Sequence, residues 1–279
     1  MDSYAYYNGK FGKKDEITIP LSDRSIYFGD AVYDAAIGSY DRILWEDEHL
    51  TRFLSNAERI GINHPYSKKY LSSLIREIAV KSMIEDYFLY MQLSRSSKDR
   101  VHSAVGTASS LLIIISPFLL TDVNIPLRLM TTEDMRYGYC DIKTVNLLPA
   151  VLVSTEAENK GFDEAVFIKN GIVTECAKSN ISIIKQGRVI SHPENNRILP
   201  GITREKLRES CLSLGIDFCE CEFTKEEMMN ADEIIVSSTS KLCRRVSEID
   251  GTKVGGKNME LSQVICDDIY KKYIVFCKI

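Results

Sequence analysis

The sequence has no long hydrophobic run, no excess of basic residues and no cysteine in its first half. Its longest apolar stretch, Leu111–Ile115 with its flanks, is far shorter than the roughly 20 residues of a membrane-spanning helix. The net charge is −4, without a basic tail or stripe, so nucleic acids and anionic membranes are not expected partners. No basic segment followed by an apolar one opens the chain, so we expect no signal peptide and a cytoplasmic location.

Cysteine and histidine are too scattered to predict a metal site. The one close pair of cysteines, Cys219 and Cys221, would share a strand face, but no second Cys or His pair stands nearby to complete a zinc site. We therefore expect no metal, and reduced thiols that pack as small apolar side chains. No role is assigned to three histidines at helix-start or turn positions, His49, His64 and His192.

Hydrophobic spacing and turn signals predict an α+β protein. Three pairs favour β-hairpin turns: Asn8-Gly9, Asn170-Gly171 and Gln186-Gly187. Helices are expected at 50–60, 71–78, 149–160, 203–214 and 224–227. Strands are expected at 4–7, 10–11, 42–45, 87–94, 110–116, 126–131, 165–168, 172–173, 181–184, 189–190 and 233–237.

The loosened pattern after Ser116 divides the chain into two predicted domains. We expect an N-terminal domain at 1–118, a linker at 119–123 and a C-terminal domain at 124–279. Each would be a sheet with helices on one side, and a ligand would bind in the cleft between the domains.

One lysine and one carboxylate stand out chemically. Lys143 is alone among apolar and small residues in Asp141–Pro149, and a buried ammonium is costly unless it is paired or chemically special. Glu175 follows thirty-two residues later, in another short polar segment between apolar runs. An amine that can form a Schiff base and a carboxylate that keeps a pyridine nitrogen protonated are the two parts that pyridoxal phosphate (PLP) chemistry requires. A surface lysine and a solvated glutamate are the alternative interpretation.

Further segments, taken in order, resemble the fold-type IV PLP enzymes of the class IV aminotransferase family. The similarity runs from about residue 4 to residue 255 and is greatest to the D-amino-acid (D-alanine) aminotransferases. The matching segments are Asp23–Tyr33, Glu48–Arg52, Asp141–Leu148, Asn196–Arg204 and Ser237–Ser240. The resemblance implies a two-domain fold in which each domain is a mainly antiparallel sheet or barrel with helices. It also implies that PLP binds in the interdomain cleft.

The resemblance also implies roles for individual residues. Lys143 would carry PLP and move a proton between the substrate Cα and the cofactor C4′. Glu175 would bond the pyridine nitrogen and keep it cationic. The other cofactor-binding residues, mostly phosphate donors, would be Arg52, Ser179, Ile202, Thr203 and Thr239.

The same resemblance also implies which residues bind the substrate, and so which substrate is expected. Arg100 and His102, with Tyr33, resemble the trap that holds the substrate carboxylate in the D-alanine type. It implies a homodimer in which the trap loop crosses the interface. D-Alanine would give its amine to 2-oxoglutarate, yielding pyruvate and D-glutamate for peptidoglycan, and another D-amino acid would leave as its own 2-oxo acid. A polar loop without function is the alternative for Arg100 and His102.

Three residues depart from the family pattern. Lys178 replaces a small hydroxyl residue beside the cofactor, Asp34 replaces a glutamate near Lys143, and Ser96 replaces a glycine in the trap loop. Three other functions stay open: a branched-chain L-amino-acid aminotransferase, an aminodeoxychorismate lyase, and a non-enzymatic relative whose site Lys178 blocks. The first of these would need an apolar side-chain pocket and no Arg100–His102 trap.

Overall fold

The computed structural model describes residues 2–96 and 99–278 of the chain. The chain folds into two compact units, the first made of Met1–Leu119 and Ile142–Asn146, the second of Leu120–Asp141 and Leu147–Ile279. The short segment Ile142–Asn146, which contains Lys143, therefore belongs to the first unit, although its neighbours in the chain belong to the second. Ser97 and Lys98, in the predicted trap loop, lie outside the described residues.

The first unit is built on a six-stranded antiparallel sheet with the order β2-β1-β6-β5-β3-β4. Its strands are β1 (Tyr4–Tyr7), β2 (Lys10–Lys13), β3 (Ala31–Ser39), β4 (Arg42–Ile43), β5 (Asp86–Arg95) and β6 (Ser109–Pro117). The turn between β1 and β2 lies at Asn8-Gly9, as predicted, and both residues have the positive φ of such hairpins. The predicted strand at 42–45 is shorter, because Trp45 has a φ of +53° where the next helix begins.

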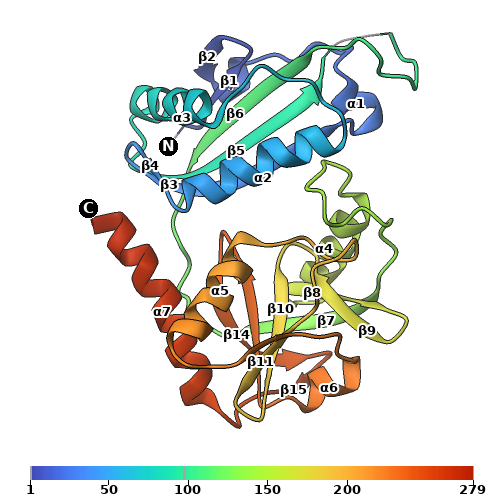
Figure 1. The fold of residues 1–279 in the computed structure, drawn as a ribbon, viewed down its shortest axis with the longest axis vertical. Coiled ribbons are helices and arrows are strands. Elements are labelled where there is room, and N and C mark those ends of the chain that lie inside the picture. The colour runs from blue at the N-terminus through green and yellow to red at the C-terminus, as the bar shows by residue number, and fades with distance from the viewer. Residues whose placement is uncertain (1, 97–98, 279) are drawn as a thin grey trace. The chain divides into compact units, whose positions relative to one another are not determined.

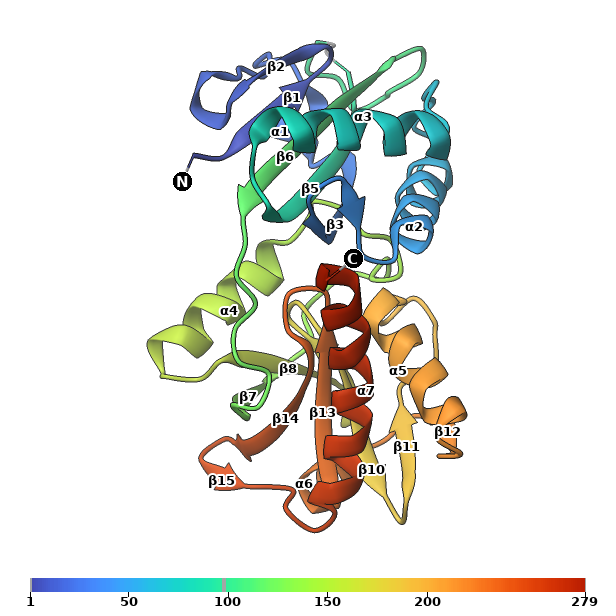
Figure 2. The same ribbon diagram turned by 90° about the vertical axis from the view of Figure 1, so that its left-hand side faces the viewer.

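Two long helices cover one face of this sheet (Figure 1 and Figure 2). The helices of the first unit are α1 (Arg24–Phe28), α2 (Glu46–Arg59) and α3 (Lys68–Ser82), with a short 3-10 turn at Lys14–Glu16. Phe53 of α2 and Ile75 of α3 are fully buried in one apolar cluster with Met91 of β5. The helix periodicity of α2 and α3 is thus confirmed, and Gly61 ends the first of them with a φ of +71°.

The second unit is built on a nine-stranded mixed sheet with the order β12-β11-β10-β13-β14-β7-β8-β9, to which β15 adds on β14. Its strands are β7 (Leu127–Glu133), β8 (Glu164–Lys169), β9 (Ile172–Cys176), β10 (Asn180–Lys185), β11 (Arg188–Ser191), β12 (Phe218–Glu220), β13 (Glu233–Ser238), β14 (Leu242–Ile249) and β15 (Thr252–Lys253). Of the strand pairs in the described residues, only β7–β8, β7–β14 and β11–β12 are parallel, so a mainly antiparallel sheet is confirmed. The hairpin turns at Asn170-Gly171 and Gln186-Gly187 are also confirmed.

The helices of the second unit are α4 (Leu148–Asn159), α5 (Ile202–Ser213), α6 (Lys225–Asn230) and α7 (Met259–Lys278). The predicted capping box at the start of α6 is present, with Thr224 and Glu227 bonding each other's backbone N–H. The last helix, α7, lies beside α5 and packs on β13 and β14, and the sequence patterns had not indicated it (Figure 2). No helix of the described residues is long and apolar enough to cross a bilayer.

Gly38 makes room for a large, fully buried side chain on the sheet of the first unit. It pairs across the strands with Tyr87, and a Cβ at Gly38 would lie 2.0 Å from Cζ of the fully buried Tyr87 ring. In an open strand the change Gly→Ala is favourable, because alanine loses less backbone entropy on folding.

We predict that Gly38→Ala lowers the free energy of unfolding by about 1–3 kcal/mol, the usual cost of overpacking. Urea denaturation of the purified protein measures this. Gly12→Ala is the matched control, since the nearest atom to its added Cβ lies at 3.6 Å. A Gly38→Ala protein as stable as the control would contradict the observed packing.

Candidate active site

Lys143 is held against β3 by backbone hydrogen bonds. The N–H of Tyr33 donates to the carbonyl of Lys143 at 2.8 Å, and the N–H of Val145 donates to Ala31 at 3.2 Å. The Lys143 ammonium lies 4.5 Å from the centre of the Tyr33 ring, which stacks on Tyr90. Among the described residues the ammonium has no hydrogen-bond partner. The backbone of Lys143 is therefore fixed while its amine stays available.

A buried carboxylate on the same strand anchors the predicted phosphate arginine. Asp34 accepts Nε and Nη2 of Arg52 at 2.8 and 2.9 Å, and it contacts Nδ1 of His49 at 2.8 Å. Burial acts to raise the pKa of Asp34, but the charge of Arg52 and the contact with His49 outweigh it and lower that pKa. Asp34 is thus an anion that orients Arg52.

His49 is a site residue that the sequence reasoning missed. It is 1% exposed, and its Nε2 has no hydrogen-bond partner among the described residues. Burial lowers the pKa of His49, and the charges of Arg52 and Lys143 add to this, while Asp34 acts against it. The three-residue spacing to Arg52, which puts both on one face of α2, is the signal that was available.

The three predicted trap residues do not lie together within one chain. Arg100 and His102 lie near Phe28, whereas Tyr33 lies near Lys143. The Arg100 guanidinium lies 5.5 Å from the centre of the Phe28 ring, and the His102 ring lies 5.4 Å from it. Both side chains are exposed. Tyr33 lies instead beneath Lys143, and among the described residues no hydrogen bond or ring contact joins it to Arg100 or His102.

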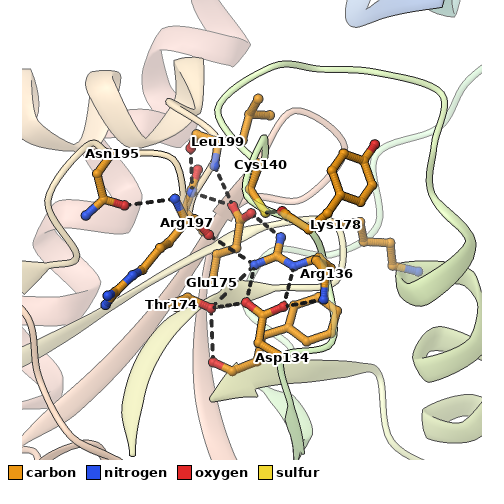
Figure 3. A network of polar contacts seen from close by, with 12 residues as sticks. Asp134, Arg136, Cys140, Thr174, Glu175, Lys178, Asn195, Arg197 and Leu199 are labelled. Carbon is orange, nitrogen blue, oxygen red and sulfur yellow. Dashed lines mark hydrogen bonds and ion pairs between the residues drawn. The ribbon is translucent and has the colours of Figure 1, made fainter. Parts of the chain in front are cut away.

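In the second unit, Glu175 at the end of β9 is the centre of a polar network (Figure 3). Its Oε1 accepts Nη1 of Arg136 at 2.5 Å. Its Oε2 accepts the amide of Asn180 at 3.1 Å and the backbone N–H of Leu199 at 3.0 Å. Glu175 is 5% exposed, so these donors compensate for the lost hydration of its carboxylate.

Arg136 is a second residue that the sequence reasoning missed. Its Nε and Nη2 donate to Asp134 at 3.0 and 2.8 Å, and its guanidinium lies 4.2 Å from the centre of the Phe167 ring. Burial acts to lower the pKa of Arg136, but its bonds to Asp134 and the charge of Glu175 raise it. A permanent cation thus fixes one side of Glu175. The short polar run after β7 was its only sequence signal.

The start of α5 offers hydrogen-bond donors without acceptors. Gly201 caps this helix without a side-chain hydrogen bond, and Oγ1 of Thr203, a residue 2% exposed, has no partner among the described residues. The hydroxyls of Ser237 and Ser238 are buried and equally without partners, and Thr239 follows them in the turn after β13. Helix N-terminal N–H groups and free hydroxyls form a donor set that suits a phosphate.

Gly201 also brings Glu175 close to the start of α5. A Cβ at Gly201 would lie 1.9 Å from Oδ1 of Asn180, the residue that donates to both Glu175 and the carbonyl of Leu199. Glycine at this position therefore permits the contact between the carboxylate network and the helix start.

Ser179 and Lys178 are organised by a buried carboxylate. Glu164 accepts the Ser179 hydroxyl at 2.9 Å and the Lys178 backbone N–H at 2.8 Å, and it pairs with Lys241. The predicted cofactor donor Ser179 is thus engaged within the chain. The Lys178 side chain points away from Glu175 (Figure 3).

Neither a metal cluster nor a disulfide is present in the described part of the chain. No group of three or more His, Cys, Asp or Glu side chains there could hold a metal ion. All eight cysteines are free thiols.

The lowered pKa of His49 predicts a pH dependence of stability. The folded protein binds a proton at His49 less readily than the unfolded chain, whose histidines have a pKa near 6.5. The free energy of unfolding should therefore fall as the pH drops below about 6.5. We predict that His49→Gln flattens this decline between about pH 7 and pH 5, in urea unfolding of the cofactor-free protein. An unchanged slope would show that His49 is not the buried neutral group described above.

The family model and the similar known proteins point to the same family. Residues 31–249 match the model of the family "Amino-transferase class IV". A D-alanine aminotransferase of Bacillus licheniformis is 34% identical over 253 residues, which are 89% of this chain and 89% of that protein. A D-alanine aminotransferase of Staphylococcus aureus is 34% identical over 278 residues, 96% of this chain and 97% of that protein.

A solved structure supports the fold. The branched-chain aminotransferase of Thermoproteus uzoniensis with norvaline superposes with a TM-score of 0.88, covers 99% of this chain and 97% of its own, and is 23% identical. This similarity shows the shared α+β fold. The match to the family model over residues 31–249 and the 34% identity to the Bacillus licheniformis protein show that the chain belongs to the class IV aminotransferase family.

Proposed function

We propose that this chain is a PLP-dependent D-amino-acid aminotransferase. It takes the amino group of D-alanine and passes it to 2-oxoglutarate, giving pyruvate and D-glutamate, and it acts in the cytoplasm to supply peptidoglycan synthesis. The observation that carries the proposal is Lys143, an amine with a fixed backbone and no hydrogen-bond partner among the described residues. The similarity to two proteins named D-alanine aminotransferase supports the choice of substrate.

The donors of the chain fit PLP. Ile202 and Thr203 at the start of α5, Thr239 after β13, and Arg52 on α2 would hold the phosphate. The unpartnered hydroxyl of Thr203 supports this assignment, since a buried donor costs free energy unless it meets an acceptor. Ser179 would help to hold the cofactor through the turn that Glu164 organises.

The reaction requires a covalent anchor, a mobile proton and a charge on the cofactor ring. When bound, PLP supplies an aldehyde that combines with amines and a ring that accepts electron density from the substrate Cα. Lys143 would hold that aldehyde covalently and would remove and return the proton at the substrate Cα. Glu175 holds a proton on the pyridine nitrogen, and Arg136 keeps the Glu175 carboxylate oriented.

Arg100, His102 and Tyr33 would bind the substrate carboxylate and thereby select the D-enantiomer. Within one chain Arg100 and His102 rest near Phe28, and Tyr33 lies beneath Lys143. We therefore propose a homodimer in which the loop carrying Arg100 and His102 serves the site of the other copy.

The absorbance of the PLP-loaded protein tests the proposal. We predict that D-alanine abolishes the long-wavelength band of bound PLP and releases pyruvate, while L-leucine leaves the band unchanged. Excess 2-oxoglutarate should then restore the band and yield D-glutamate.

Other outcomes of this experiment would support one of the alternative functions. A response to L-leucine alone would make the protein a branched-chain aminotransferase and would remove the role of Arg100 and His102. Pyruvate formed from aminodeoxychorismate would indicate a lyase. A PLP-saturated protein without a long-wavelength band would contradict all three enzymatic functions, and would leave the non-enzymatic relative.

A further inference from the structure

We infer that Arg24 is a positioning residue for substrate recognition: it holds the peptide segment that carries Arg100 and His102 in one conformation. The inference rests on the proposed function, because it assigns Arg24 a role through the substrate trap. Neither the motifs of the sequence nor the family comparison assigns a role to this residue.

The guanidinium of Arg24 donates hydrogen bonds to two consecutive backbone carbonyls in the segment that carries Arg100 and His102. Its Nη1 donates to the carbonyl of Val101 at 2.6 Å, and its Nη2 donates to the carbonyl of His102 at 2.9 Å. These residues lie 77 and 78 positions further along the chain. Two adjacent carbonyls bound by one rigid fork fix the peptide groups on either side of the His102 Cα, and Arg100 is the residue just before the first of these carbonyls.

Arg24 is itself fixed on its remaining sides. Its Nε donates to Asp30 at 2.8 Å, and the other oxygen of Asp30 accepts Nε of Arg95, the last residue of β5, at 2.9 Å. The Arg24 side chain is 3% exposed, and its guanidinium lies 4.6 Å from the centre of the Phe28 ring. Asp30 thus joins Arg24 to Arg95 at the end of β5.

Phe28 completes the arrangement. Its ring has the Arg24 guanidinium at 4.6 Å, the Arg100 guanidinium at 5.5 Å and the His102 ring at 5.4 Å. Cations and imidazoles are attracted to aromatic faces, but at an exposed site such contacts are weak. The exposed side chains of Arg100 and His102 therefore depend on the buried Arg24 for a defined backbone. A segment without this support would have to be ordered by the substrate itself, which weakens binding.

The test compares Arg24→Gln, Arg24→Lys and a control, Arg76→Gln, in the full-length PLP-loaded protein. Arg76 is a half-exposed arginine of α3 that pairs with Glu46. Two quantities are measured: the rate at which an arginine-specific protease cuts after Arg100, read by mass spectrometry, and KM and kcat with D-alanine. The absorbance of bound PLP verifies that each variant is folded and loaded.

We expect Arg24→Gln to speed cleavage after Arg100 and to raise KM for D-alanine roughly tenfold or more, with kcat within about threefold of wild type. Arg24→Lys keeps the positive charge near Asp30 but cannot bind both carbonyls with one planar group. Its cleavage rate and its KM should therefore lie between those of Arg24→Gln and of the wild type. If Arg24→Gln does not bind PLP, the cleavage rate and KM of Arg24→Lys alone test the inference. Arg76→Gln should leave both quantities unchanged.

Cleavage and KM at wild-type values in Arg24→Lys and Arg24→Gln would overturn the inference. So would a loss of kcat at constant KM, which would indicate general damage to the site. The cleavage rate does not depend on the substrate. A wild-type protein inactive with D-alanine would therefore refute the proposed function, whereas unchanged cleavage would refute the role of Arg24 whatever the substrate is.

Discussion

The pairing of Ile142–Asn146 with the start of β3 sets the geometry around Lys143. Two backbone hydrogen bonds and the bridge between Val32 and Thr144 fix this segment, so Lys143 has a defined position without using its side chain. The same turn before β3 receives Asn146, whose amide donates to the carbonyl of Gly29 at 2.9 Å. A Cβ at Gly29 would collide with Asn146, so a glycine is required there. The helix before this turn is α1, which supplies Arg24.

Buried charge is compensated separately in each unit. In the first, Asp34 is shared by Arg52 and His49; in the second, Arg136 is shared by Asp134 and Glu175. Each cluster contains an arginine, whose planar fork can satisfy more than one acceptor at once. Removing Arg52 or Arg136 would leave a buried carboxylate without its cation, which costs about 3–5 kcal/mol.

The local elements could be predicted because their signals are local. The pairs Asn8-Gly9 and Asn170-Gly171 adopt positive φ at little cost, and the apolar spacing of α2 and α3 fits one helix face. Lys143 and Glu175 are candidates that sequence motifs single out. The partners that hold the site were not predicted, because Arg24 meets His102 and Arg136 meets Glu175 across 78 and 39 positions of the chain. No periodic pattern encodes such long-range pairing of single polar residues.

Locating the covalent attachment of PLP is the sharpest test of the role of Lys143. The PLP-loaded protein would be reduced with borohydride, digested and mapped by mass spectrometry. We expect a phosphopyridoxyl group on Lys143 and on no other lysine. The backbone of Lys143 is fixed by hydrogen bonds to β3, and its amine is left available. A modification on Lys178 or elsewhere, with Lys143 unmodified, would contradict this role.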